Sequence, residues 1–556
     1  TPVTDDLIAH DNNVNSNDKA LVYDSFVTMV LKEVQEKTGL DPYNDGLTIE
    51  TTIDSKAQQR LYDIVNTNDY IQYVNEKIQN AVVMLDTKTG AVRAVNGGRK
   101  QTTLLGYNRA TDNTRSTGST IKPVIDYGPA IEYLNYSTGQ TIMDQRTTYS
   151  NGVELNNWDF SHKGAMTLRT ALVYSRNTTA LQTFKAVGET NIKSFLNNLD
   201  IQIKNDGQDY LVESNSIGAD ISPIKMAAAY ATFGNYGTYS KPYTVRKVTT
   251  RDGQVTEFKP EQKQAMKDST AYMITDVLKD SFKYGFATQA TIPGLPTAAK
   301  TGSSNYTVEQ KRAMGASDYE DIIPDSWFIG YSTDYTISAW TGYDNPYEQG
   351  GGVDTTEQEY SRLIYYYLMK YMAESSSGDD WVQPDSVVKQ QIEIGSNPLR
   401  LPGPRTPANM IATEVFVKGH VPTQQSMNYG TKIEGPTGLK ATYDKSKKTL
   451  TVTWDNYKTN SKDKPQYKVT VNGQTQTVST NKVTFQNISG PSVSVTLVVT
   501  VGKDSSDPIT NEFQLEQPTT AEERTTQQNQ QQNNRQQNNN NSNNNNEQTT
   551  QEARNQ

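Results

Sequence analysis

Residues 115–123 read Arg115-Ser116-Thr117-Gly118-Ser119-Thr120-Ile121-Lys122-Pro123. Ser119 opens a predicted helix and Lys122 follows three positions later, so we expect the two side chains on one helical face. A serine hydroxyl is a weak nucleophile until a neighbouring base takes its proton, and the Lys122 amine suits that role. Gly118 permits a close backbone approach before the helix. The helix N-terminus adds backbone N–H groups that favour a developing oxyanion.

Two later motifs distinguish Ser119 from other serines that have a lysine three positions on, such as Ser222. Ser175-Arg176-Asn177 is a Ser-x-Asn pattern in an apolar region that we predict to be helical. Lys300-Thr301-Gly302-Ser303 leads into a predicted sheet strand. The chain thus carries Ser-x-x-Lys, Ser-x-Asn and Lys-Thr-Gly in that order.

Composition narrows the class of protein. The 556 residues carry a formal net charge of −9 without a basic block, which argues against nucleic acid as a partner. Cysteine is absent, and the histidines at positions 10, 162 and 420 are far apart, so we expect no metal and no cofactor. No apolar run is long enough to span a bilayer and no signal peptide is present. We expect any membrane anchor to lie upstream.

Hydrophobic periodicity predicts strand pairs, then a block of helices, then more strands and a helix. Alternation predicts strands at 47–53, 81–86, 91–95, 326–331 and 335–343. Helical spacing predicts a helix capped by Asp54 and further helices at 119–133, 164–186, 222–234 and 360–372. Because both arms of the 81–95 hairpin are apolar, we place them in the middle of the sheet. The order is typical of an α+β fold, a mostly antiparallel sheet with helices on its faces.

Changes in composition divide the chain into five predicted segments. They are a linker remnant from a missing upstream region (1–46), the α+β domain (47–395), a Pro-rich linker (396–434), a small fibronectin type III-like β-sandwich (435–516) and a disordered Asn/Gln-rich tail (517–556). Short alternating strands predict the β-sandwich, with Trp454 and Tyr467 as candidate core aromatics. The first residue is Thr1, so we expect a processed chain or a fragment.

The three motifs in this order resemble the serine acyltransferase set of penicillin-binding proteins and β-lactamases. Their flanks, with segments 228–233 and 340–344, resemble the transpeptidase domain of class A (bifunctional) penicillin-binding proteins. The extra β-domain and Asn/Gln tail are most like the 1a type of streptococci and related Gram-positive bacteria. The resemblance runs from about Leu47 to Met372. It implies a penicillin-binding/serine β-lactamase-like transpeptidase domain.

The resemblance implies a D,D-transpeptidase that cross-links peptidoglycan stem peptides ending in D-Ala-D-Ala. Ser119 is implied as the nucleophile that attacks the carbonyl between the two D-alanines, and Lys122 as its base. Ser175 is implied to relay a proton toward the leaving group, and Asn177 to bind the substrate amide. Lys300 is implied to supply positive potential and to lower the pKa of Lys122.

The Lys-Thr-Gly strand is implied to hold the substrate. Thr301 and Ser303 would bind its carboxylate, with Gly302 between them in the same substrate-binding strand. Backbone N–H groups of Ser119 and Ser303 would form the oxyanion hole. β-Lactam antibiotics are implied to acylate the same serine and to hydrolyse slowly.

Class A members carry an upstream glycosyltransferase domain and a membrane anchor. Residues 1–46 are too short for the first and too polar for the second, so both are expected only in a longer parent. That parent would act on the extracellular face of the bacterial cytoplasmic membrane. The β-sandwich is expected either to bind wall polymer or divisome or elongasome proteins, or to serve as a spacer.

Two other functions remain open from the motifs. A β-lactamase or a D,D-carboxypeptidase uses the same residues but passes the acyl group to water. A catalytically inactive sensor would bind β-lactams or wall ligands without turnover. The class A flanks and the appended β-domain favour the transpeptidase over the β-lactamase and the carboxypeptidase, and the presence of all motif side chains argues against the inactive sensor.

Overall fold

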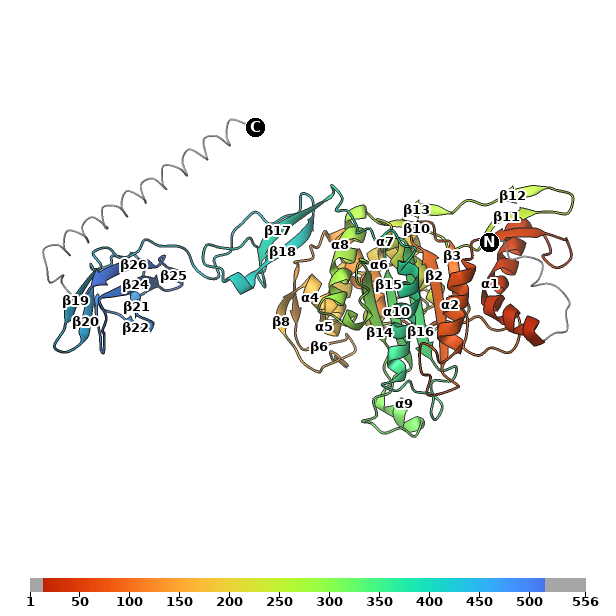
Figure 1. The fold of residues 1–556 in the computed structure, drawn as a ribbon, viewed down its shortest axis with the longest axis horizontal. Helices are drawn as coiled ribbons and strands as arrows, with labels where there is room; N and C mark the ends of the chain where they lie inside the picture. The colour runs from red at the N-terminus through yellow and green to blue at the C-terminus, as the bar shows by residue number, and fades with distance from the viewer. Residues whose placement is uncertain (1–13, 516–556) are drawn as a thin grey trace, which may run out of the picture. The chain divides into compact units, whose positions relative to one another are not determined.

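The computed structural model describes residues 14–515 (Figure 1), so the predicted tail at 517–556 lies outside the described residues. Contacts divide the chain into two compact units. One comprises Thr1–Leu401 with Ala408–Gln425, and the other Pro402–Pro407 with Ser426–Gln556. The first unit contains all three motifs.

A five-stranded antiparallel sheet forms the centre of the first unit. Its order is β14 (Ala298–Ser303), β15 (Asp325–Tyr331), β16 (Tyr335–Gly342), β2 (Gln79–Asp86) and β3 (Val92–Asn96). Lys300 lies opposite Ile329 on the neighbouring strand. The Lys-Thr-Gly motif therefore occupies an edge strand of this sheet.

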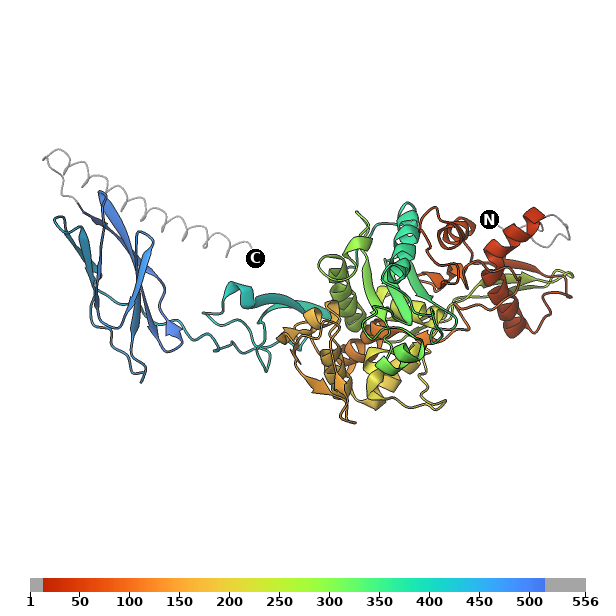
Figure 2. The same cartoon turned by 90° about the horizontal axis from the view of Figure 1, so that it is seen from below.

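Helices cover both faces of the sheet, as the α+β prediction requires (Figures 1 and 2). Val83 and Leu85 of β2 pack in one core with helices α7 (Pro223–Gly234) and α8 (Asp268–Lys279). Val82 and Met84 pack in a second core with α2 (Ser55–Asn66) and α10 (Tyr360–Ala373). This alternation follows from the two-residue period of a strand. The predicted helices at α2, α7 and α10 are confirmed, and Asp54 caps α2.

Strand β3 lies at the other edge of the sheet, so its predicted place in the middle was wrong. It is nevertheless buried, because other segments occupy its outer hydrogen-bonding groups. The Gln58 side chain accepts a bond from the Val95 N–H at 2.8 Å and donates one to the Val95 carbonyl at 2.9 Å. The Asp54 N–H donates to the Arg93 carbonyl. Polar groups from α2 thus replace the missing neighbouring strand, which apolar content alone does not predict.

Smaller elements complete the first unit. The remaining helices are α1 (Val14–Thr38), α3 (Gly128–Leu134), α4 (Leu168–Val173), α5 (Asn177–Val187), α6 (Glu189–Asn198) and α9 (Val308–Ala313). The remaining strands are β1 (Thr48–Thr51), β4 (Arg115–Ser116), β5 (Thr141–Asp144), β6 (Thr147–Thr148), β7 (Glu154–Leu155), β8 (Gly164–Thr167), β9 (Asp220–Ile221), β10 (Thr238–Ser240), β11 (Val245–Thr249), β12 (Val255–Glu257) and β13 (Gln262–Gln264).

Helix α1 belongs to the first unit, although residues 1–46 were predicted to be a linker remnant. Phe26, Val30 and Val34 are buried in the same core as α7. The Ser25 hydroxyl accepts a hydrogen bond from the Gly97 N–H at 2.9 Å. The helical spacing of these apolar residues therefore reflects tertiary packing.

The predicted linker at 396–434 also contains ordered structure. Strand β18 (Ile411–Val417) pairs along its length with β17 (Val387–Glu393). Val415 and Phe416 are buried, and Glu414 forms an ion pair with Arg169 of α4. The sequence predicted a linker here because a polar, Pro-rich context surrounds β18.

The second unit is a β-sandwich, as predicted. One sheet has the order β19 (Lys440–Asp444), β20 (Thr449–Thr453) and β23 (Lys482–Phe485). The other contains β22 (Gln474–Val478), β21 (Gln466–Val471), β24 (Ser492–Val501) and β25 (Asp504–Ser505), and β26 (Ile509–Gln514) also pairs with β24. Trp454 and Tyr467 are buried with ring centroids 5.0 Å apart. Strands β22 and β26 were not predicted because their side chains are mostly exposed and polar.

Between residues 14 and 515, none of the helices is both long enough and apolar enough to cross a bilayer.

We predict that Phe26→Ala destabilises the first unit by about 3–5 kcal/mol, because it leaves a cavity where a 2% exposed ring now packs. Thermal unfolding should show a lower transition temperature for this unit. Tyr43→Ala is the matched control, since that ring is 67% exposed. Equal transition temperatures for Phe26→Ala and the wild type would mean that α1 is not part of the folded unit.

Candidate active site

Ser119 lies on a 3₁₀ turn, Gly118–Ile121, which a π-helical turn at Pro123–Tyr127 follows before α3 begins. Sequence analysis predicted one continuous helix at 119–133. The change of helix type follows from Pro123, which has no N–H to donate to the Ser119 carbonyl. That carbonyl accepts from the Lys122 N–H, three residues on. Side chains three residues apart eclipse in a 3₁₀ helix, so Ser119 and Lys122 still share a face.

Two glycines let this turn lie directly against β14. Gly118 has a φ of 49°, and a Cβ added there would lie 2.3 Å from the Ser303 carbonyl oxygen. A Cβ on Gly302 would lie 2.5 Å from the Thr117 carbonyl oxygen. Any side chain at either position would separate the two segments. The first and third motifs are therefore in backbone contact.

Ser175 occupies the short connection between α4 and α5, where the sequence predicted helix. Its φ of 54° places it in the left-handed region, which is uncommon for a residue other than glycine. The Ser175 N–H donates to the Leu172 carbonyl. Strained backbone of this kind persists where surrounding contacts determine it.

The second motif meets both lysines. The Lys122 amine donates to the Ser175 carbonyl at 2.8 Å and to the Asn177 side-chain oxygen at 2.7 Å, and lies 3.3 Å from the Ser175 hydroxyl. The Lys300 amine donates to the same hydroxyl at 2.8 Å and to the Thr301 carbonyl at 2.9 Å. The Ser175 hydroxyl therefore lies between two lysine amines.

Burial sets the protonation of this pair. Removal from water, and then the positive charge of Lys300, hold the pKa of Lys122 well below its usual value. Burial lowers the pKa of Lys300 to about 7. Two ammonium groups this close in a buried site repel each other. These pKa shifts favour Lys122 as the neutral amine of the pair and leave the charge on Lys300 below its pKa of about 7.

The Ser119 side chain is half-buried. Within the described part of the chain no hydrogen bond joins its hydroxyl to the Lys122 amine, which Ser175 and Asn177 hold instead. Catalytic hydrogen bonds are often long in an unliganded enzyme and shorten when substrate binds.

Arg176, the central residue of the Ser-x-Asn motif, anchors the Ser175 connection through two ion pairs. It is 2% exposed, and its guanidinium donates to Asp144 and Asp159, each at 2.9 Å. The Asn157 side chain accepts a bond from the Asn177 N–H at 2.7 Å. Sequence analysis missed these contacts because Asp144, at the end of β5, and Asn157 and Asp159, between β7 and β8, show no local pattern that links them to Arg176.

The substrate-binding candidates lie on the edge strand. Ser303 is exposed, Thr301 is half-buried and Gly302 is buried. Because β14 has a sheet neighbour only on the β15 side, its other edge offers backbone groups to an extended peptide. No group of His, Asp or Glu side chains in residues 14–515 is arranged to hold a metal ion.

Asp126 is a buried carboxyl on the π-helical turn, one turn beyond Lys122. Its side chain is fully buried, and both oxygens lack a hydrogen-bond partner among the described residues. Burial raises the pKa of Asp126 well above its usual value, and the nearby Lys122 opposes this rise without reversing it. Burial therefore favours the protonated form of Asp126 in the folded state.

We predict that Asp126→Asn stabilises the protein at pH 8 and that the gain shrinks toward pH 4. The folded state retains a proton that the unfolded chain releases above its own carboxyl pKa, so the wild type loses stability as pH rises. Urea unfolding at several pH values measures the difference. Asp69→Asn, at an exposed carboxylate, is the control. A less stable Asp126→Asn at pH 8 would indicate an ionised pair with Lys122.

Two protein-family models match parts of this chain. Residues 80–364, just over half of the chain, match the model described as the penicillin binding protein transpeptidase domain. Residues 383–431 match the model described as the penicillin-binding protein 1A C-terminal domain, and this stretch includes β17 and β18.

Two curated relatives of this chain are penicillin-binding proteins. Penicillin-binding protein 1A/1B of Bacillus subtilis is 40% identical over 443 residues, which cover 78% of this chain and 47% of the relative. Penicillin-binding protein 1A of Streptococcus pneumoniae is 36% identical over 423 residues, 73% of this chain and 57% of the relative. The chain thus spans about half the length of these relatives.

Solved structures share the fold at low identity. PonA1 from Mycobacterium tuberculosis has a TM-score of 0.56 at 22% identity, covering 66% of this chain and 95% of that one. Penicillin-binding protein 1A from Haemophilus influenzae has a TM-score of 0.58 at 18% identity, covering 72% and 77%. The solved structures share the fold, and the match over residues 80–364 shows that the chain belongs to the penicillin-binding protein transpeptidase domain family.

Proposed function

We propose that this chain is a serine D,D-transpeptidase that cross-links peptidoglycan stem peptides and is acylated by β-lactams. The observation that carries the proposal is the Ser175 hydroxyl held between the buried amines of Lys122 and Lys300, beside the turn that bears Ser119. Family membership gives the reaction class, and these contacts support the individual roles.

The first step forms an acyl-enzyme. The Ser119 oxygen bonds to the carbonyl carbon between the two terminal D-alanines, and neutral Lys122 takes the hydroxyl proton. Its lowered pKa supports this role, because a base must be unprotonated to act. The backbone N–H groups of Ser119 and Ser303 would stabilise the oxyanion, and the close packing of Gly118 on Ser303 supports their convergence.

Breakdown of the tetrahedral species releases D-alanine. Its amine leaves with a proton delivered through the Ser175 hydroxyl, which both lysines contact. The Asn177 side chain accepts from Lys122 and donates to the Asn156 carbonyl at 2.8 Å, and this fixed side chain would orient the substrate amide. Lys300 with Thr301 and Ser303 would hold the terminal carboxylate. An amine of a second stem peptide then attacks the acyl carbon, which forms the cross-link and frees Ser119.

The longer parent would add two features. A glycosyltransferase domain and a membrane anchor would place the transpeptidase at the extracellular face of the bacterial membrane. The relatives are about twice the length matched here, which supports further domains in the parent. We propose the five segments that the sequence predicts with two changes: α1 and β18 belong to the transpeptidase unit.

We predict a persistent single benzylpenicillin adduct on the wild type and none on Ser119→Ala, by intact mass. Ser479→Ala is the matched control, because Ser479 also precedes a lysine by three positions and is exposed in the β-sandwich unit. An adduct on Ser119→Ala would contradict the nucleophile assignment. Rapid drug hydrolysis without a lasting adduct would indicate a β-lactamase.

We predict that the second-order rate of acylation falls as pH rises through the pKa of Lys300, about 7 in the free protein. The reason is that the drug carboxylate loses its cationic partner while Lys122 is already neutral. Lys300→Arg keeps its charge across this range, so its profile should lack the fall even if its maximum rate is lower. Rates with a chromogenic penicillin from pH 5 to about 9.5 measure both. The same alkaline fall in both proteins would contradict the assignment.

A further inference from the structure

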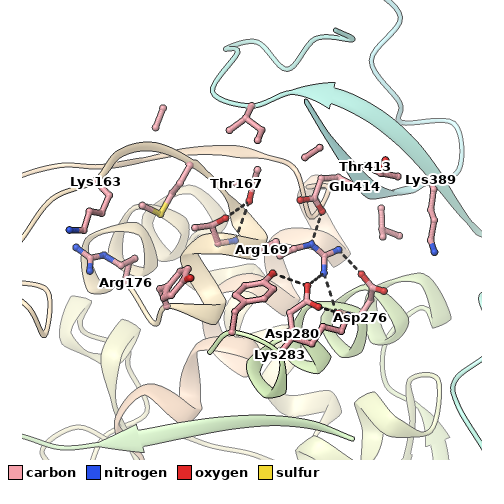
Figure 3. Close-up of a pocket in the computed structure, with 18 of the residues that line it drawn as sticks. Lys163, Thr167, Arg169, Arg176, Asp276, Asp280, Lys283, Lys389, Thr413 and Glu414 are labelled. Carbon is pink, nitrogen blue, oxygen red and sulfur yellow. Dashed lines mark hydrogen bonds and ion pairs between the residues drawn. The ribbon is translucent and has the colours of Figure 1, made fainter. Parts of the chain in front are cut away.

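A cavity of about 1040 Å³ adjoins the Ser175 connection between α4 and α5, and Arg176 is among the residues that line it (Figure 3). Residues of α4, α8 and β18 line it, together with Tyr174 and Arg176 on either side of Ser175. Neither Ser119 nor the Lys-Thr-Gly strand belongs to its lining. The volume matches sites that hold a ligand of several hundred daltons.

The floor of the cavity is a preformed ion cluster. Arg169 donates to Asp276 at 2.5 Å, to Asp280 at 2.7 Å and to Glu414 at 2.8 Å. These partners lie on or just after α8 and on β18, so the cluster holds the strand pair β17–β18 against the helices. Carboxylates and a guanidinium fixed in this way offer hydrogen-bond acceptors and donors to a ligand rich in hydroxyl groups.

One wall of the cavity is aromatic and open to solvent. Trp158 is 55% exposed, Tyr174 40% and Tyr284 44%. The Trp158 indole donates to the Tyr174 carbonyl at 3.0 Å, and the Tyr174 and Tyr284 rings lie 6.1 Å apart. Exposed aromatic rings gathered in a cavity mark a binding surface, because they leave apolar area in water.

Two lysines give the cavity its unbalanced charge. Lys163 and Lys389 are exposed, and neither ammonium group has an ion-pair partner in residues 14–515. Figure 3 shows them on opposite sides of the Arg169 cluster. Lys283, by contrast, is paired with Asp280 at 2.7 Å. An anionic group on the ligand would supply the missing partner.

We propose that this cavity binds a sugar joined to a peptide that bears carboxylates, namely a disaccharide–peptide unit of the cell wall. The ring's apolar face would pack on the aromatic wall, its hydroxyl groups would bond to the ion cluster, and peptide carboxylates would pair with the lysines. The inference rests on the proposed transpeptidase function, since it makes the cavity a second site for the same polymer. Binding here would hold a strand of wall beside the motif cleft.

The test uses a reduced disaccharide–tripeptide, which lacks D-Ala-D-Ala and so cannot acylate Ser119. Calorimetric titration of the whole chain should give saturable binding, and prior acylation with benzylpenicillin should leave it unchanged. Lys389→Glu should weaken binding by about tenfold or more through loss of a charge contact. Lys259→Glu, an exposed lysine outside the cavity lining, should not. Tyr284→Ala should also weaken it.

The outcomes separate this inference from the proposed function. Normal penicillin acylation of Lys389→Glu with weakened muropeptide binding supports both. Normal acylation of the wild type without muropeptide binding, or with equal binding by both charge variants, overturns the cavity assignment alone. A glycerol phosphate oligomer that binds while the muropeptide does not also overturns it. Failure of the wild type to be acylated defeats the transpeptidase proposal and this inference with it.

Discussion

Two lysine amines buried around one serine hydroxyl are the constraint on which the site depends. Each ammonium group loses hydration on burial, and each raises the free energy of charging the other. Hydrogen bonds to the Ser175 carbonyl, its hydroxyl and the Asn177 amide replace water at these amines. In the free site this arrangement disfavours two charges at once, so the same geometry favours a neutral base beside a cation.

That device requires three distant segments to meet within hydrogen-bond reach. Gly118 and Gly302 remove the side chains that would keep the Ser119 turn from the edge strand. Arg176 ties the strained Ser175 connection to carboxylates behind it. The unpaired carboxyl of Asp126 shows that polar burial around the site is not fully compensated. The strained Ser175 backbone and the unpaired Asp126 carboxyl both destabilise the fold locally, and both lie where catalysis requires a fixed geometry.

The sequence predicts what is periodic or carried by a motif. Strands β15 and β16 and helices α2 and α10 follow from hydrophobic patterns, and the three motifs converge as their order suggests. Features set by tertiary contacts were not predictable. The helix type at Ser119 depends on one missing N–H at Pro123. The polar strand β26 is recognisable only through its pairing with β24.

The Gln58 side chain limits how two copies of this chain can pair through the edges of their central sheets. With β3 closed by Gln58 and Asp54, the central sheet has one open margin, at β14. Were both margins open, β3 of one copy could pair with β14 of the next in a head-to-tail contact that never closes on itself. Such contacts build fibres, and they would also cover the strand that the substrate needs. The Gln58 amide and the Asp54 N–H thus withdraw β3 from such pairing, while the reactive edge at β14 stays available.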